Sequence, residues 1–199
     1  MSTFPSQANV VVIGGGIVGN SMAYQLALHG WTDILLLDKG PFPNPGGSTG
    51  HASNFIFLVD HSKEMTKFTV DSVRQYRDLG VFIECGGIEV ARRPERMEEL
   101  KRRMASGTSW GIEDLSLLTP AEVQEKVPFL DPKVILGGFF TAGVGVVDSL
   151  RAGTLMRERA MEMGALTVSG ATEVTGIEVE GGHVRGVRTD GATSESAPL

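Results

Sequence analysis

Short apolar runs and one helical repeat organise the first forty residues. Residues 9–13 (NVVVI) are a β-branched run that stops at glycine, which predicts a buried parallel strand. Apolar residues recur every three or four positions between 20 and 29, which predicts a helix that ends at Gly30. A second buried strand is predicted at 33–38. Strand, helix and strand together form one βαβ unit.

The rest of the chain continues this mixed pattern after a loop at residues 40–54. Helices are predicted at 62–79, 94–106, from 119 onward and 149–164, and strands at 86–91, 134–147, 165–169, 173–180 and 184–189. Gly181-Gly182 joins the last two strands and favours a hairpin. Residues 190–199 are small and polar, so we expect them to be poorly ordered. Because no closing element follows the last strand, we expect the chain to be a fragment of a longer protein.

Three glycines in the first turn have the spacing G-x-G-x-x-G. Gly14 permits the tight turn, Gly16 leaves no side chain between the backbone and a pyrophosphate, and Gly19 lets the helix pack closely on the strand. The free N–H groups of the helix N-terminus favour the pyrophosphate charge. Asp38 lies 22 residues after Gly16, where an acid accepts hydrogen bonds from ribose hydroxyls. An acid there disfavours the 2′-phosphate of NADP, so NAD and FAD stay open.

The loop after the second strand carries further candidate chemistry. It is longer than an ordinary connection of about 2–6 residues, and it contains the stretch GGSTGHASNF from Gly46 to Phe55. Ser48 and Thr49 could donate hydrogen bonds to a pyrophosphate or to ribityl hydroxyls. His51 could act as a general base, as a hydrogen-bond donor or as a nucleophile.

Composition narrows the possible partners. The 199 residues carry a net charge of −6 and no basic run, which argues against nucleic acid and against an anionic membrane surface. One cysteine excludes an internal disulfide and a multi-cysteine metal site. No apolar run approaches the roughly 20 residues that span a bilayer, and the start of the sequence leaves no room for a signal peptide. We expect a cytoplasmic protein, with the mitochondrial matrix as an alternative.

Several stretches together resemble the dimethylglycine/sarcosine dehydrogenase and oxidase group, within the FAD-dependent D-amino-acid-oxidase superfamily. The most specific stretches are VVIGGGIVG at 11–19, LDKGP at 37–41 and GGSTGHA at 46–52, and the resemblance continues at 86–91, 110–113, 119–122 and 174–177. It implies an α/β fold with a Rossmann-like, glutathione reductase-like FAD domain, incomplete at its C-terminus and interrupted by a β-rich substrate lobe. The implied FAD domain covers residues 1–80 and 142–199, and the lobe covers 81–141.

The resemblance also implies a cofactor site. In that group the loop histidine is joined through a ring nitrogen to the 8α carbon of the flavin, and this position maps to His51. Gly50 stands where the group commonly has serine, so one hydroxyl is missing. The further FAD contacts that the resemblance implies are Ile17, Val18, Asp38, Lys39, Ser48, Thr49, Phe55 and Val174.

The implied reaction is the oxidation of an N-methyl amine such as dimethylglycine or sarcosine. Hydride passes to flavin N5, and the one-carbon unit leaves as formaldehyde or is captured by tetrahydrofolate in the full-length protein. Electrons would go to oxygen or to an acceptor protein. The substrate-side acid and base are implied to lie beyond residue 199, so no catalytic residue and no metal ligand are assigned. Two alternatives stay open: an NAD-dependent dehydrogenase, and a truncated flavin-binding fragment without activity.

Overall fold

A computed structural model describes residues 5–190 and 193–196 and divides the chain into two compact units. The first unit is Met1–Ser53 with Asp148–Leu199, and the second is Asn54–Val147. These bounds differ from the predicted domain boundaries, because α2 (Lys63–Asp78) contacts β5 (Phe82–Glu84), which in turn pairs with β9 (Gly145–Val147). The assignment of one part to the cofactor and the other to the substrate stays a prediction.

A three-stranded parallel sheet forms the centre of the first unit. Its order is β10 (Leu166–Ser169), β3 (Ile34–Leu37), β2 (Val10–Ile13), so both predicted strands are confirmed as parallel strands. The predicted burial holds for β3 but not for β2, which is only partly buried and whose Ile13 is 51% exposed. Every side chain of β3 is buried. An apolar run without alternation suits this central position, because both faces of the strand are covered.

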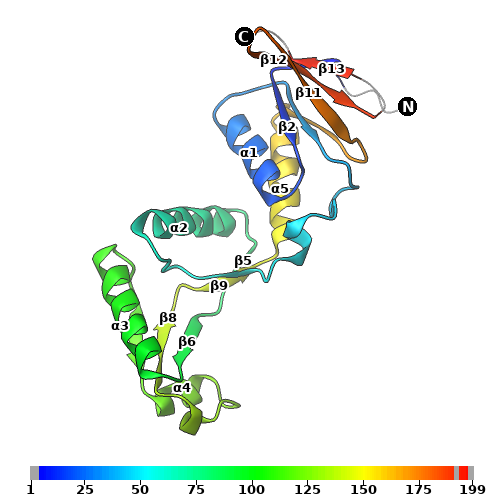
Figure 1. Cartoon of the computed structure of the whole chain (residues 1–199). Coiled ribbons are helices and arrows are strands. Elements are labelled where there is room, and N and C mark those ends of the chain that lie inside the picture. The colour runs from blue at the N-terminus through cyan, green and yellow to red at the C-terminus, as the bar shows by residue number, and fades with distance from the viewer. Residues whose placement is uncertain (1–4, 191–192, 197–199) are drawn as a thin grey trace. The chain divides into compact units, whose positions relative to one another are not determined.

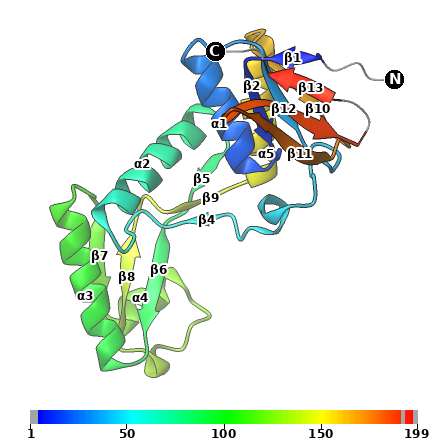
Figure 2. The same cartoon turned by 45° about the horizontal axis from the view of Figure 1, so that its top comes forward.

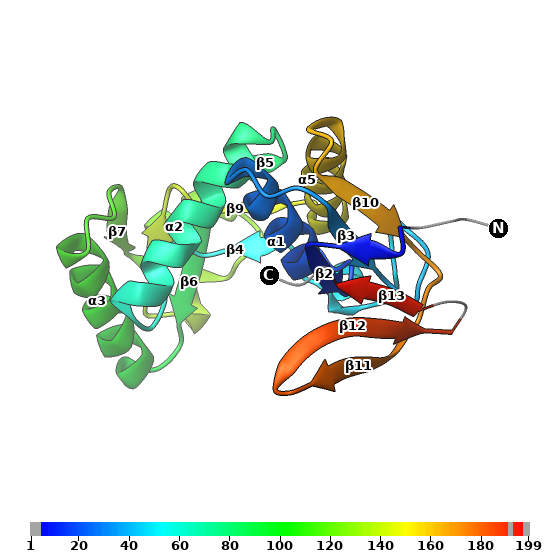
Figure 3. The ribbon, with the colours of Figure 1, turned by 90° about the horizontal axis from the view of Figure 1, so that it is seen from above.

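Two helices and a second sheet cover the parallel sheet. The helices α1 (Ile17–Leu28) and α5 (Ser149–Glu162) pack side by side, with α1 against β2 and β3 and α5 against β10 (Figure 1). The second sheet has the order β1 (Gln7–Ala8), β13 (Thr193–Ser196), β12 (His183–Thr189), β11 (Val174–Glu180) (Figures 2 and 3). Ala8, Leu35, Leu37 and Val187 form a buried cluster that joins the two sheets.

Two sequence predictions about this unit need correction. The first helix begins at Ile17 rather than at residue 20, because Gly16 is its extended N-cap residue and Gly19 already lies within the helix. The tail predicted to be poorly ordered contains β13, whose backbone pairs with both β12 and β1. Backbone groups supply this pairing whatever the side chains are. The remaining tail residues, 191–192 and 197–199, lie outside the described part of the chain.

The second unit contains two antiparallel three-stranded sheets and three helices. The sheet orders are β4 (Phe55–Ile56), β9, β5 and β6 (Gly87–Ala91), β8 (Gly137–Thr141), β7 (Leu115–Leu118). The helices are α2, α3 (Pro94–Ser109) and α4 (Pro120–Lys126). The helix predicted from residue 119 onward is confirmed, and Thr119 caps it in a reciprocal capping box with Glu122. The strands missed from sequence are two to four residues long, too short for a period-2 pattern.

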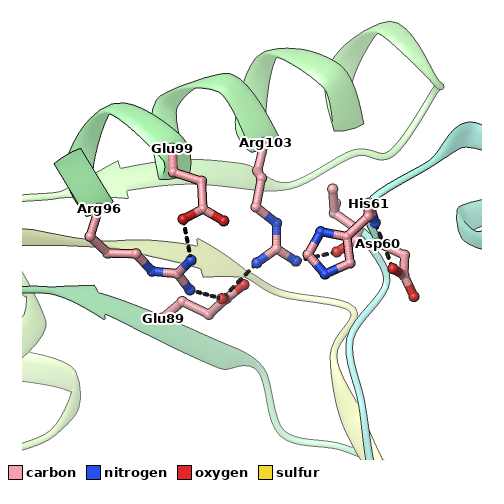
Figure 4. Close-up of polar contacts among 7 residues, drawn as sticks. Asp60, His61, Glu89, Arg96, Glu99 and Arg103 are labelled. Atoms are coloured by element: carbon pink, nitrogen blue, oxygen red, sulfur yellow. Dashed lines mark hydrogen bonds and ion pairs between the residues drawn. The ribbon is translucent and has the colours of Figure 1, made fainter.

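The charged face of α3 is only partly solvated, because three of its charged side chains bond within the second unit. Arg103 donates to Oε2 of Glu89 at 2.7 Å and to the carbonyl oxygen of Val59 at 2.6 Å (Figure 4). Arg96 donates to the same carboxylate at 2.6 Å and pairs with Glu99. Glu89 and Arg103 are largely buried. These contacts hold α3 on β6 within the second unit.

Candidate functional site

The glycine turn between β2 and α1 brings backbone atoms unusually close together. Gly14 has φ +103°, a conformation that side chains with a Cβ rarely adopt. A Cβ on Gly19 would lie 1.8 Å from the carbonyl oxygen of Gly14. A Cβ on Gly16 would lie 3.0 Å from Oγ1 of Thr49. Each glycine of the signature therefore has a geometric reason, and no acidic side chain occupies the first turn of α1.

The carboxylate of Asp38 joins the glycine turn to the loop that follows β3. Its Oδ2 accepts a hydrogen bond from the backbone N–H of Gly15 at 2.6 Å, and its Oδ1 accepts one from Gly40 at 2.8 Å. Each carboxylate oxygen has a further lone pair, so Asp38 can still accept from ribose hydroxyls. The acid thus supports the turn as well as being available to a ligand.

We expect Asp38→Asn to destabilise the first unit. The asparagine amide would present N–H₂ to a backbone N–H, so one donor would lose its acceptor at a cost of about 1–3 kcal/mol. Urea unfolding measures this change in the free energy of unfolding. Glu162→Gln, which neutralises an exposed carboxylate of the same unit, is the control. Equal stability of Asp38→Asn and the control would contradict the supporting role.

The loop with the histidine is tied to both helices of the first unit. Residues Ser48–His51 form a 3₁₀ turn. Oγ1 of Thr49 accepts from the backbone N–H of Ile17 at 2.9 Å, and the carbonyl oxygen of Thr49 accepts from Oγ of Ser149 at 2.9 Å. The Thr49 hydroxyl keeps its own proton to donate. His51 is exposed at the end of this anchored turn.

A cavity of about 520 Å³ opens beside Asp38 at the carboxyl ends of β2 and β3. Among the predicted site residues Gly14, Asp38, Lys39 and Val174 line it, together with Ile13, Leu37, Pro45, Gly46, Gly47, Thr172 and Glu173. Apolar and glycine walls with a few polar side chains, among them the acid Asp38 at the end of β3, suit a purine base and its ribose. The residues present therefore fit the adenosine and diphosphate portion of a dinucleotide.

The other predicted residues have separate surroundings. Val18 is 77% exposed in the first turn of α1, and Ser48 and His51 do not line the cavity. Phe55 belongs to the second unit, where it pairs with Val146 and packs edge-on against Phe57. The roles of all these residues as cofactor contacts stay predictions.

Sequence reasoning missed a buried polar layer behind the glycine turn. Asn20, 3% exposed, donates from Nδ2 to the carbonyl oxygen of Gly15 at 2.7 Å and accepts from Arg157. The ring of Phe42 packs against Gly15, where a Cβ would lie 2.3 Å from it. The available signal was a polar Asn20 and a charged Arg157 at positions where the helical repeat calls for core residues.

The described ranges 5–190 and 193–196 contain neither a candidate metal site nor a candidate membrane-spanning helix. These residues contain no group of three histidine, cysteine or acidic side chains that could hold a metal ion. None of the helices described there is long and apolar enough to cross a bilayer.

Three curated proteins are similar to most of this chain. Human mitochondrial dimethylglycine dehydrogenase is 32% identical over 167 residues, 80% of this chain and 19% of that protein. Human mitochondrial sarcosine dehydrogenase is 31% identical over 183 residues, 88% of this chain and 20% of that protein. The mouse mitochondrial pyruvate dehydrogenase phosphatase regulatory subunit is 31% identical over 193 residues, 94% of this chain and 22% of that protein. This chain thus spans about a fifth of these relatives.

A solved structure shows the same fold. L-proline dehydrogenase from P. horikoshii matches with a TM-score of 0.89 and 26% identity, over 97% of this chain and 52% of that chain. The family model described as FAD dependent oxidoreductase, DAO, matches residues 9–197. The cofactor of this family is FAD, so family membership favours FAD over NAD as the dinucleotide. The chain belongs to the DAO family of FAD-dependent oxidoreductases.

Proposed function

We propose that this chain is the FAD-binding part of an enzyme that oxidises an N-methyl amine such as dimethylglycine or sarcosine. The observation that carries the proposal is the bond between Thr49 and Ile17, which ties the turn bearing His51 to the first turn of the dinucleotide helix. An NAD-dependent dehydrogenase has no need of such a loop. The names of two relatives, dimethylglycine dehydrogenase and sarcosine dehydrogenase, support the substrate class.

The chain's own residues would hold and orient the cofactor. Asp38 would accept hydrogen bonds from the adenosine ribose, and the first turn of α1 with the Thr49 hydroxyl would hold the diphosphate. His51, exposed on its turn, would hold the flavin covalently through a ring nitrogen. The flavin, when bound, supplies the hydride acceptor for the amine C–H bond. Capture of the one-carbon unit by tetrahydrofolate is a prediction for a longer chain.

A regulatory, non-catalytic role is the second candidate. The mouse relative named as a regulatory subunit is similar over 94% of this chain, a larger share than either dehydrogenase covers. Such a protein would keep the fold and the dinucleotide site without turning over an amine. Substrate reduction of bound flavin separates the two candidates.

The test is anaerobic mixing of dimethylglycine or sarcosine with the FAD-loaded full-length protein, which includes the substrate side, while flavin absorbance is followed. The proposal predicts bleaching by both amines, because the nitrogen lone pair stabilises the carbon that loses hydride. Glycine betaine, whose quaternary nitrogen has no lone pair, is the matched control and should leave the absorbance unchanged. A flavin that is bound but never bleached by either amine would support the regulatory candidate instead.

A further inference from the structure

Arg157 is a buried cation without an ion-pair partner. It lies on α5 and is only 7% exposed. Its guanidinium donates to Oδ1 of Asn20 at 3.3 Å and to Oγ1 of Thr154 at 3.5 Å, and lies 4.3 Å from the centre of the Phe42 ring. Its partners are thus an amide, a hydroxyl and a ring, and among the described residues no carboxylate forms a salt bridge with it.

The contacts of Arg157 converge on the glycine turn from two sides. On one side, the amide of Asn20 accepts a hydrogen bond from the guanidinium and donates one to the carbonyl oxygen of Gly15. On the other side, the ring of Phe42 contacts both the guanidinium and Gly15. Gly153 makes room for this arrangement, because a Cβ there would lie 3.0 Å from Nδ2 of Asn20. One side chain of α5 therefore braces both the turn and the loop that follows β3.

A buried charge of this kind is costly unless something compensates it. Burial disfavours the charged form and lowers the pKa of Arg157, while the carboxylate of the exposed neighbour Glu158 opposes this. Arginine nonetheless stays protonated at neutral pH. Removing a cation from water without an anion costs free energy, and the low local dielectric strengthens its attraction to any anion that binds nearby.

We propose that Arg157 positions the dinucleotide turn and that the diphosphate of the cofactor compensates its buried charge. The neutral contacts through Asn20 and Phe42 hold the shape of the turn, and the guanidinium charge behind it favours a doubly charged ligand. This role of Arg157 concerns the dinucleotide site alone and does not depend on the amine substrate or on His51.

Isothermal titration of the 199-residue chain with ADP and with adenosine distinguishes two effects of Arg157: its charge, which acts on the diphosphate, and its contacts, which hold the shape of the turn. Arg157→Met should weaken ADP binding by about tenfold, because the charge is lost, and leave adenosine binding nearly unchanged. Arg157→Lys keeps the charge and should restore most of the ADP affinity. Arg151→Met removes an exposed arginine from the same helix and is the matched control; its ratio of ADP to adenosine affinity should equal that of the wild type.

Other outcomes overturn the proposal. Equal weakening of ADP and adenosine would mean that Arg157 only supports the fold, and an unchanged ADP affinity would mean that its charge is irrelevant. The same change in Arg151→Met would assign the effect to net charge. If circular dichroism shows that Arg157→Met does not fold, Arg157→Gln carries the test, because glutamine keeps a donor for Asn20 without the charge.

Discussion

Replacing His51 by alanine is expected to abolish the flavin fluorescence that stays with the polypeptide on a denaturing gel. Two hydrogen bonds to Thr49 hold the turn Ser48–His51. The side-chain Oγ1 of Thr49 accepts from the N–H of Ile17, and its carbonyl oxygen accepts from the hydroxyl of Ser149. These bonds hold the turn that carries His51, and an imidazole nitrogen is a competent nucleophile. Because alanine has no nucleophilic atom, the loss of covalent flavin should be complete, while noncovalent binding of FAD should persist.

The experiment compares acid-denatured wild type with His51→Ala under ultraviolet light, with His29→Ala as the control. His29 is the C-cap residue of α1 in the same unit, so its replacement should keep the fluorescence. A yellow native protein whose wild-type band shows no fluorescence would mean noncovalent flavin and would refute the proposed role of His51. A colourless wild type would instead mean that this chain alone does not retain FAD.

Gly19→Val should remove the dinucleotide site and destabilise the first unit. The first atom of any side chain at this position would lie 1.8 Å from the carbonyl oxygen of Gly14, and 3.4 Å from a methyl group of Val12. The clashing atom belongs to the backbone and cannot rotate out of the way as the end of a side chain can, so α1 must move away from the turn. Overpacking of this kind costs about 3 kcal/mol, and the displaced helix N-terminus can no longer face a diphosphate.

Urea unfolding and retention of FAD on gel filtration measure the two effects. Gly47→Ala is the matched control for the unfolding measurement, because a Cβ on Gly47 meets no atom and its φ of −86° suits any residue. The control should unfold at the wild-type urea concentration. A Gly19→Val protein that is as stable as the control would show that the close contact between Gly14 and Gly19 is not required.

Much of the fold could be predicted from local pattern. The parallel strands at 9–13 and 33–38, the helices of the second unit and the last hairpin were predicted within a few residues, because their apolar patterns or turn residues can be read locally. The strands β4, β5 and β7 were missed because they are short. β13 was missed because its backbone pairing, with β12 and β1, is not encoded in a polar tail.

For the site, the sequence by itself determined the parts that follow a local rule. The spacing of Gly14, Gly16 and Gly19 predicted the tight turn. The position of Asp38 at the end of the second strand predicted that its carboxylate lies close to that turn. Family membership, established by comparison over residues 9–197, agrees with the resemblance found in the motifs. The covalent role of His51 and the amine substrate stay predictions that the experiments above test.

Only the tertiary structure decided which distant residues support the site. Arg157 reaches Asn20 across 137 positions of sequence, and Ser149 reaches Thr49 across 100. No local repeat relates such residues, because they meet only when α5 packs beside α1 and the loop after β3 folds back on the glycine turn. Sequence spacing therefore predicted which residues face the cofactor, and packing determined which distant residues support the glycine turn and its neighbouring loop.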